Sequence, residues 1–174
     1  MEIVKISPSS VKIKSKLGAF AIDPVDTKGT VEADAVLFLN RTLKQQDINV
    51  PTNTVIINGP GEYEIKGVKF TGLGRGDKIA YSGRFDNVDT LIVKASSFNS
   101  TKELARECNI LLVEADEIVD QSLVALTNAS VVVLYGEKAV DSVTKLGKEA
   151  IAEVNKMVMT KDKLPTDMQV VVIG

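Results

Sequence analysis

The sequence contains no histidine in its 174 residues. Imidazole is the usual side chain for binding zinc and for transferring protons near neutral pH. Its absence excludes histidine-ligated zinc sites, and it excludes every catalytic arrangement in which a histidine activates a serine or a cysteine. Any chemistry or binding that this protein performs must therefore use other side chains.

Cysteine and tryptophan are equally scarce. The one cysteine, Cys108, has no partner for an internal disulfide, which fits a reducing compartment. Its apolar neighbours Ile110 and Leu111 indicate a buried thiol rather than a nucleophile. Tryptophan is absent and aromatic residues make up only 5% of the chain, so platforms for stacking bases or sugars are few.

The charges are nearly balanced, with a net charge of −2, which supplies no basic footprint for DNA or RNA. The lysines near the start, at positions 5, 12, 14 and 16, fit the solvent face of a pair of strands. No apolar run approaches the roughly 18 residues of a membrane span. The first residues lack the basic and apolar regions of a secretory signal. We expect a cytoplasmic protein that binds neither nucleic acid nor membrane.

The remaining composition, 44% apolar and 25% charged, is that of an ordinary soluble globular protein. A chain of this length suits one domain, and neither an internal repeat nor a low-complexity linker interrupts it. We predict a single domain over residues 1–174.

Short apolar or alternating segments predict strands in the first half, and helical segments alternate with apolar strands in the second half. A capping box of Ser100 and Glu103 predicts the start of one short helix. The expected strands are 2–6, 10–14, 19–22, 35–39, 54–57, 68–72, 79–82, 90–94, 110–113, 131–134, 157–159 and 169–173. The other expected helices are 118–126 and 138–147, with further helix over 148–156.

The most constrained stretch is Asn58–Gly67, which holds three glycines and a proline. Glycine accepts positive φ and proline fixes its own φ, so the backbone turns sharply here before entering a strand with Tyr63 on its inner face. We predict a hairpin corner. Its carboxylates, Glu62 and Glu64, are more typical of a solvated turn than of a catalytic pair.

The order of these pieces resembles the metallo-β-lactamase fold family, in particular small bacterial proteins similar to ascorbate-phosphate lactonases. The resemblance is carried most specifically by the Asn58–Gly67 stretch. The other segments that carry it are 20–24, 32–39, 109–113, 131–134, 161–165 and 169–172. It implies an α/β (α+β) protein built as a four-layer αββα sandwich. The short chain implies that the sandwich is trimmed.

In that family the strand matching 36–39 runs into a histidine-rich motif that holds one or two metals. Here the resemblance places Asn40, Thr42 and Gln45 at histidine positions and Lys44 at the aspartate position. The positions that it implies for the remaining ligands are Pro8, Ser96 or Ser97, and Gly136. The resemblance therefore implies that the metal ligands are lost and that no catalytic residue and no cofactor remains.

This pattern favours a pseudoenzyme, a non-catalytic protein that serves as a binding or assembly module. The residues at the former metal cleft, together with Arg41, would give it a positive charge, so a small anion such as a phosphate ester is a conceivable ligand. The expected ligand pocket consists of Asp23, Asn40, Lys44 and Glu62. The same residues are also typical of a solvated loop, and Asp23 before Pro24 is typical of a strand end.

The alternative is a lactonase- or phosphoesterase-like hydrolase with a carboxylate-only site for Mg²⁺ or Mn²⁺. Its candidate ligands are Asp23, Glu62, Glu64, Asp86 and Asp89. No pair among them has a spacing that forces the side chains together. A third expectation, which overlaps with the first, is assembly into a homo-oligomer or with a protein partner.

Overall fold

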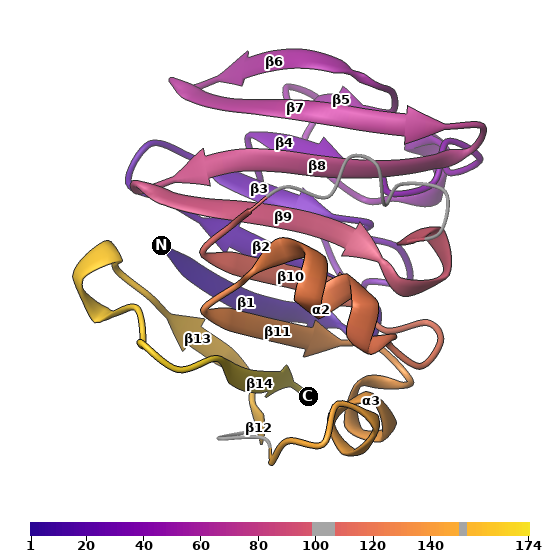
Figure 1. Ribbon diagram of the computed structural model, residues 1–174. Coiled ribbons are helices and arrows are strands. Elements are labelled where there is room, and N and C mark those ends of the chain that lie inside the picture. Colours follow the sequence, from indigo (N-terminus) through magenta and orange to yellow (C-terminus); the bar gives the residue numbers. More distant parts are fainter. Residues whose placement is uncertain (99–106, 150–152) are drawn as a thin grey trace.

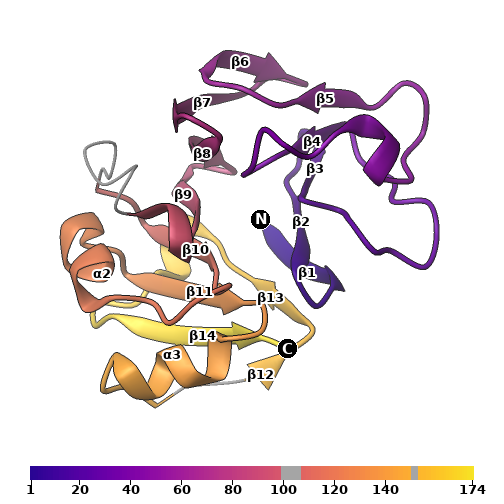
Figure 2. The same ribbon diagram turned by 90° about the vertical axis from the view of Figure 1, so that its right-hand side faces the viewer.

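The computed structural model describes residues 1–98, 107–149 and 153–174. They form two β-sheets that face each other across a shared apolar interior, with helices against the outer face of one sheet (Figures 1 and 2). No helix in these ranges is both long enough and apolar enough to cross a membrane.

The N-terminal half supplies most of a six-stranded sheet with the order β13-β1-β2-β3-β4-β5. Its strands are β1 (Glu2–Ser7), β2 (Ser10–Lys14), β3 (Ala19–Ile22), β4 (Ala35–Leu37), β5 (Val55–Ile57) and β13 (Lys156–Val158). β3, β4 and β5 run parallel to one another, whereas β1 pairs antiparallel with β2 and β13.

The second sheet has eight strands in the order β12-β14-β11-β10-β9-β8-β7-β6. They are β6 (Gly61–Ile65), β7 (Val68–Arg75), β8 (Lys78–Phe85), β9 (Val88–Lys94), β10 (Ile110–Glu114), β11 (Val131–Tyr135), β12 (Glu153–Val154) and β14 (Gln169–Ile173). The antiparallel strands β6 to β9 lead into the parallel strands β9, β10, β11 and β14. The predicted strands of both halves are confirmed.

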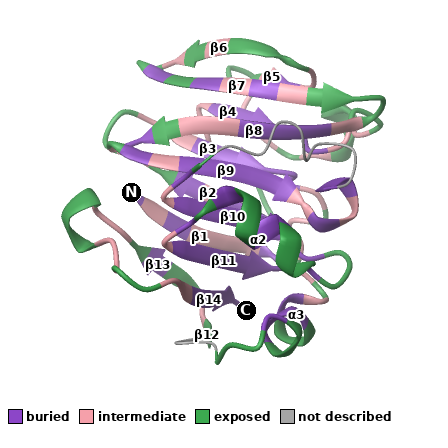
Figure 3. Cartoon of the chain, in the orientation of Figure 1, coloured by how far each residue is buried: buried purple, intermediate pink, exposed green. Residues whose placement is uncertain are grey.

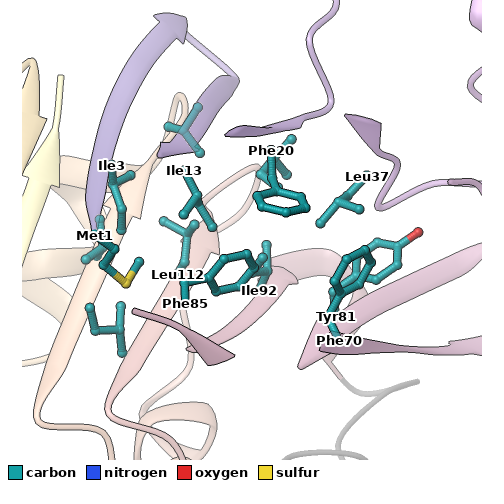
Figure 4. Packing of buried hydrophobic residues seen from close by; sticks show 14 of the residues in the cluster. Met1, Ile3, Ile13, Phe20, Leu37, Phe70, Tyr81, Phe85, Ile92 and Leu112 are labelled. Carbon is teal, nitrogen blue, oxygen red and sulfur yellow. The ribbon is translucent and has the colours of Figure 1, made fainter. Parts of the chain in front are cut away.

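Side chains that alternate along the strands fill the space between the sheets. Ile110 and Leu112 on β10 point inward, whereas Leu111 and Val113 point to the outer face. At the centre, the ring of Phe20 meets Phe85 edge-on, with ring centroids 5.3 Å apart (Figure 4). Both faces of the central strands are buried, which explains their continuous apolar runs (Figure 3).

Two short helices, α2 (Gln121–Thr127) and α3 (Ala139–Lys145), cover the outer face of the eight-stranded sheet (Figure 2). The carboxylate of Asp120 caps α2 by accepting from the N–H of Ser122 at 2.7 Å. The outer face of the six-stranded sheet is covered instead by loop residues such as Ile48. The αββα architecture is thus confirmed, and within the described ranges its outermost layer over the six-stranded sheet is loop rather than α-helix.

We predicted a hairpin at the Gly-Pro-Gly corner of the Asn58–Gly67 stretch, and this prediction was wrong. The corner instead carries the chain from β5, the last strand of one sheet, to β6, the last strand of the other. The Tyr63 hydroxyl donates to the carbonyl of Gly59 at 2.9 Å and holds the corner against β6. The hairpin follows at Lys66 and Gly67, which both have positive φ.

We predicted helix over 148–156, and this was wrong from Glu153 onward. Strands β12 and β13 begin there and form the outer strands of the two sheets. Pairing with β14 and β1 decides their conformation, and no local pattern signals it. The Ser100–Glu103 capping box lies outside the described residues.

The close approach of β7 to the corner gives a first prediction. A Cβ added at Gly72 would lie 2.6 Å from the Gly59 carbonyl oxygen and 2.9 Å from a ring carbon of Tyr81. Gly72→Ala should therefore lower the free energy of unfolding by about 1–3 kcal/mol. Gly29→Ala is the matched control, because no atom lies within 4 Å of its added Cβ, and it should change stability by less than about 0.5 kcal/mol. Equal urea midpoints for the two variants would contradict this packing.

Candidate functional site

Three polar residues stand side by side at the carboxyl ends of neighbouring parallel strands. In the register of β9, β10 and β11, Lys94 pairs with Glu114 and Glu114 pairs with Tyr135. Two residues earlier on each strand, Ile92, Leu112 and Val133 belong to the apolar interior between the sheets. Because side chains alternate with a period of two, the three polar side chains face that interior as well.

The Lys94 ammonium forms the centre of this group. Its Nζ lies 2.8 Å from Oε1 of Glu114 and 3.8 Å from Oδ2 of Asp116. Burial lowers the pKa of Lys94, but the hydrogen bond from its ammonium to Glu114 and the charges of both carboxylates outweigh burial and raise that pKa above its ordinary value. Lys94 is therefore a fixed positive charge. The other oxygen of Asp116, Oδ1, accepts from the N–H of Ser96 at 3.0 Å.

Asp23 joins this group from the facing sheet. It follows β3 with a φ of 41°, is only 3% exposed, and accepts from the Leu39 N–H at 3.0 Å. Burial, followed by the negative charge of Glu114, raises the pKa of Asp23 to about 7, although the Leu39 N–H and the Lys94 charge oppose this. We call Asp23, Lys94, Glu114, Asp116 and Tyr135 the edge cluster.

Two buried oxygens of the edge cluster have no hydrogen-bond partner among the described residues. They are Oε2 of Glu114, a residue that is 4% exposed, and the hydroxyl of Tyr135, which is 1% exposed. Burial raises the pKa of Tyr135 well above its ordinary value, and the charges of the Glu114, Asp23 and Asp116 carboxylates raise it further. The phenol therefore stays neutral and lies within the field of these carboxylates.

The residues predicted at the former metal motif do not line a cleft. Asn40 forms an isolated bridge with Lys78, the Ile79 N–H donates to the Leu39 carbonyl, and the Arg41 N–H donates to the Asp77 carbonyl. The chain after β4 is thus joined directly to the start of β8. Beyond this junction Thr42, Lys44 and Gln45 are exposed.

The predicted ligand pocket of Asp23, Asn40, Lys44 and Glu62 is not formed. Asp23 is buried beneath Leu39, whereas Lys44 lies on the exposed loop after β4. Glu62 is exposed on β6, where it borders a shallow surface hollow with Glu64 and Lys69. Asp23 thus lies in the interior, whereas Lys44 and Glu62 are exposed to solvent.

The other positions implied by the resemblance lie around the same end of the sheet as the edge cluster. Ser97 is buried in the 3₁₀ turn η2 (Ala95–Ser97) that follows β9. Gly136 has a φ of 100° and lies so close to Ala115 that an added Cβ would be 3.2 Å from its carbonyl oxygen. Pro8 and Gly136 border a surface hollow of about 460 Å³.

Three of the five candidate carboxylates of the alternative metal site take part in separate ion pairs. Asp86 binds the α-amino group of Met1 at 3.0 Å, Asp89 binds Arg84 at 2.7 Å, and Glu64 lies 3.6 Å from Lys69. Asp86 precedes β9 and Lys94 ends it, so Asp86 lies at the opposite end of the sheet from the edge cluster. Among the residues that the structure describes, no three histidine, cysteine, aspartate or glutamate side chains are placed to hold a metal ion.

We did not predict from the sequence that Lys94, Glu114, Asp116 and Tyr135 lie together. A signal for three of them exists in the sequence, because each is the last inward-facing position of a strand whose earlier inward positions are apolar. The predicted strands 110–113 and 131–134 end one residue before Glu114 and Tyr135. The meeting of the three side chains depends on parallel pairing, which the sequence does not specify.

We compared the sequence and the structure with known proteins, and only the structure gave similar proteins. The sequence matches no protein-family model and no curated protein. In structure it is similar to a proposed Zn-dependent hydrolase of the metallo-beta-lactamase superfamily from Thermotoga maritima, with a TM-score of 0.74, 17% identity, and coverage of 98% of this chain and 97% of that one.

Two further solved structures agree. A proposed metal-dependent hydrolase from Parabacteroides distasonis has a TM-score of 0.66 and 14% identity, with 98% of this chain and 91% of that chain covered. The metallo-beta-lactamase fold protein YhfI from Bacillus subtilis has a TM-score of 0.58 and 11% identity, with 98% and 95% covered. Likeness at such low identities establishes the fold, not the activity.

The proton on Asp23 gives a second prediction. Its pKa is about 7 in the folded protein against an ordinary 3.8, so between these values the folded state keeps a proton that the unfolded chain has released. Stability from this group is therefore greatest below about pH 4 and falls as the pH rises to about 7, by at most about 1.4 kcal/mol per pH unit.

Asp23→Asn removes the titrating group and keeps an acceptor for the Leu39 N–H. The free energy of unfolding of the variant, measured in urea, should therefore rise relative to wild type between about pH 4.5 and about pH 7.5. Parallel pH profiles for the two proteins would show that Asp23 does not hold a proton in the folded state.

Proposed function

We propose that this protein, which has the metallo-β-lactamase fold, is a pseudoenzyme that serves as a binding or assembly module. The observation that supports the proposal most directly is the Lys94 ammonium, which lies 2.8 Å from Glu114 at the carboxyl ends of the parallel strands. Metal-dependent hydrolysis needs ligands that donate electron pairs to a metal, which then activates a water molecule. This end of the sheet instead holds a cation already.

The edge cluster does not fit a catalytic metal centre. In an effective dielectric of about 20, a dication 4 Å from a lysine ammonium is repelled by about 8 kcal/mol. The carboxylate oxygen nearest to Lys94 is taken up by the ion pair, and the chain offers no imidazole to replace it. The residues therefore favour a structural cluster over one that activates water.

The junction between β4 and β8 supports the same conclusion. In the metallo-β-lactamase fold family that the sequence resembles, the segment matching the one after β4 carries most of the metal ligands. Here Leu39 and Arg41 are hydrogen bonded to β8, and Leu39 is fully buried. The backbone at this position is therefore paired with β8 and does not form a free loop beside the edge cluster. The carboxylate-only alternative is also disfavoured, because three of its five candidate ligands, Glu64, Asp86 and Asp89, are held in separate ion pairs.

For the binding role, the hollow beside Pro8 and Gly136 is the strongest candidate location. Its walls include Val140, which is 60% exposed, and the buried Ile173. Its charged lining consists of Lys5, Glu137 and Glu153. This lining favours an apolar group of a ligand or of a protein partner, including a second copy of the chain, over the small anion expected from the sequence.

The experiment that tests the proposal combines elemental analysis with an activity screen. Protein purified without chelator should contain far less than one equivalent of zinc, manganese or iron. It should not hydrolyse aryl phosphate mono- and diesters or lactones above the buffer rate, with or without added Zn²⁺, Mn²⁺ or Mg²⁺. One bound equivalent of metal together with turnover that EDTA abolishes would refute the proposal. Light scattering on the same sample distinguishes an assembling protein from a monomer that binds a ligand.

A further inference from the structure

We infer that the outer edge of β6 is a docking site for an extended segment of a protein partner. This segment would join the sheet as a further strand and carry lysine or arginine at alternate positions. The site lies at the opposite end of the strand order from β12 and β14, which border the hollow beside Pro8 and Gly136. The inference thus adds a surface beyond the proposed function, and it holds whether or not the protein is catalytic.

The first observation is that one side of β6 is open. β6 is the last strand of the eight-stranded sheet (Figure 1). Within the described ranges it pairs only with β7, and Gly61, Glu62 and Glu64 are exposed (Figure 3). The backbone groups along an open edge are available to bond an incoming strand.

The turn of the β6–β7 hairpin determines which backbone groups face the open side. Residues 66–67 both have positive φ, as in a type I′ turn, and the flanking residues Ile65 and Val68 of such a turn are hydrogen bonded to each other. Bonded and non-bonded pairs alternate along an antiparallel ladder. The N–H and C=O groups of Glu62 and Glu64 therefore point away from β7 and present two donors and two acceptors at the edge.

The inner face of β6 is apolar and incompletely covered. Tyr63 and Ile65 pack against the interior between the sheets but are only half-buried. Val55 on β5 faces the same interior, because it stands two residues before the buried Ile57, and it is 43% exposed. β5 and β6 are the last strands of their sheets, so the interior is open at this end. Apolar side chains on one face of a partner strand would cover it.

The outer face of β6 is acidic. The side chains of Glu62 and Glu64 border a surface hollow of about 440 Å³ together with Lys69 on β7. Lys69 lies 3.6 Å from Glu64, but no lysine or arginine in the described ranges forms an ion pair with Glu62. Opposite charges on directly opposed residues stabilise the pairing of two strands. A partner strand with alternating basic and apolar residues therefore fits both faces of β6.

The same carboxylates disfavour a second copy of this chain as the occupant. If two β6 strands paired antiparallel through these backbone groups, the central pair would be Glu62 with Glu64, Glu62 with Glu62 or Glu64 with Glu64. Like charges directly opposite each other destabilise strand pairing. The edge thus opposes self-association and favours a basic partner.

The test uses a peptide of alternating lysine and valine, as long as β6 and with blocked ends. Binding to isotope-labelled wild-type protein is followed by NMR. At about ten times Kd, the amides of Glu62 and Glu64 should exchange with solvent about tenfold more slowly, because they become hydrogen bonded to the peptide. The Ile65 amide, which is already bonded within the hairpin, is the internal reference and should change little.

Two control peptides test charge and alternation separately. One has the same composition but places all its lysines before its valines, so it keeps the charge and loses the alternation. The other alternates glutamate and valine, so it keeps the alternation and reverses the charge. Each should bind about tenfold more weakly than the alternating lysine–valine peptide.

Two double variants test the role of the carboxylates. Glu62→Gln combined with Glu64→Gln should raise the Kd of the lysine–valine peptide about three- to tenfold, because two pairs of opposite charges are lost. Glu117→Gln combined with Glu149→Gln is the matched control. It makes the same change in net charge at two exposed carboxylates that follow β10 and α3, and it should leave Kd unchanged.

The inference is overturned if the lysine–valine peptide does not bind at about 1 mM. It is also overturned if the peptide with separated lysines or the Glu62→Gln, Glu64→Gln variant binds equally well, or if the amides of Glu62 and Glu64 stay unprotected. Protection of these amides that grows with protein concentration without peptide would identify a second copy as the occupant, against the inference. None of these results refutes the proposed function, which metal-dependent turnover by the wild type would refute.

Discussion

The ion pair between Lys94 and Glu114 is 2.8 Å long and joins two neighbouring parallel strands at the end of an otherwise apolar interior. Both side chains occupy inward positions that apolar residues fill elsewhere on the same strands. A buried carboxylate without a partner would cost several kcal/mol, so each charge requires the other. The charges of Glu114 and Lys94 both affect the pKa of Asp23, which comes from the facing sheet. The Asp23 carboxyl also accepts a hydrogen bond from the Leu39 N–H. The pair links two neighbouring strands of one sheet, and of its two charges Glu114 has the larger effect on the Asp23 carboxyl of the facing sheet, whose pKa it raises.

The segment that follows β4 is fixed to the rest of the sandwich by backbone hydrogen bonds. The anchored Leu39 leads directly into the hydrogen bonds between the segment after β4 and β8, so the place of a metal-binding loop becomes part of the sandwich. The layer outside the six-stranded sheet is correspondingly thin and made of loops in the described ranges. The result is a pair of facing sheets with α-helices on one outer face only among the described residues.

Much of the fold was predictable because apolar periodicity is local. The strands 10–14, 19–22 and 169–173 have the predicted bounds. Contacts between distant segments were not predictable. The Gly-Pro-Gly corner connects two sheets instead of closing a hairpin. Asn40, which we expected in a ligand pocket, instead forms a bridge with Lys78 at the start of β8. Lys94, Glu114 and Tyr135 meet only through parallel pairing of three strands.

The central claim is that Lys94 and Glu114 depend on each other inside the sandwich, and a double-mutant cycle measures this dependence directly. Free energies of unfolding in urea are compared for Lys94→Met, Glu114→Leu and the double variant. Each single variant should lose about 3–5 kcal/mol because it leaves one charge buried and unpaired, and the double variant should lose far less than the sum, because apolar side chains replace both charges. Losses that simply add would contradict the account.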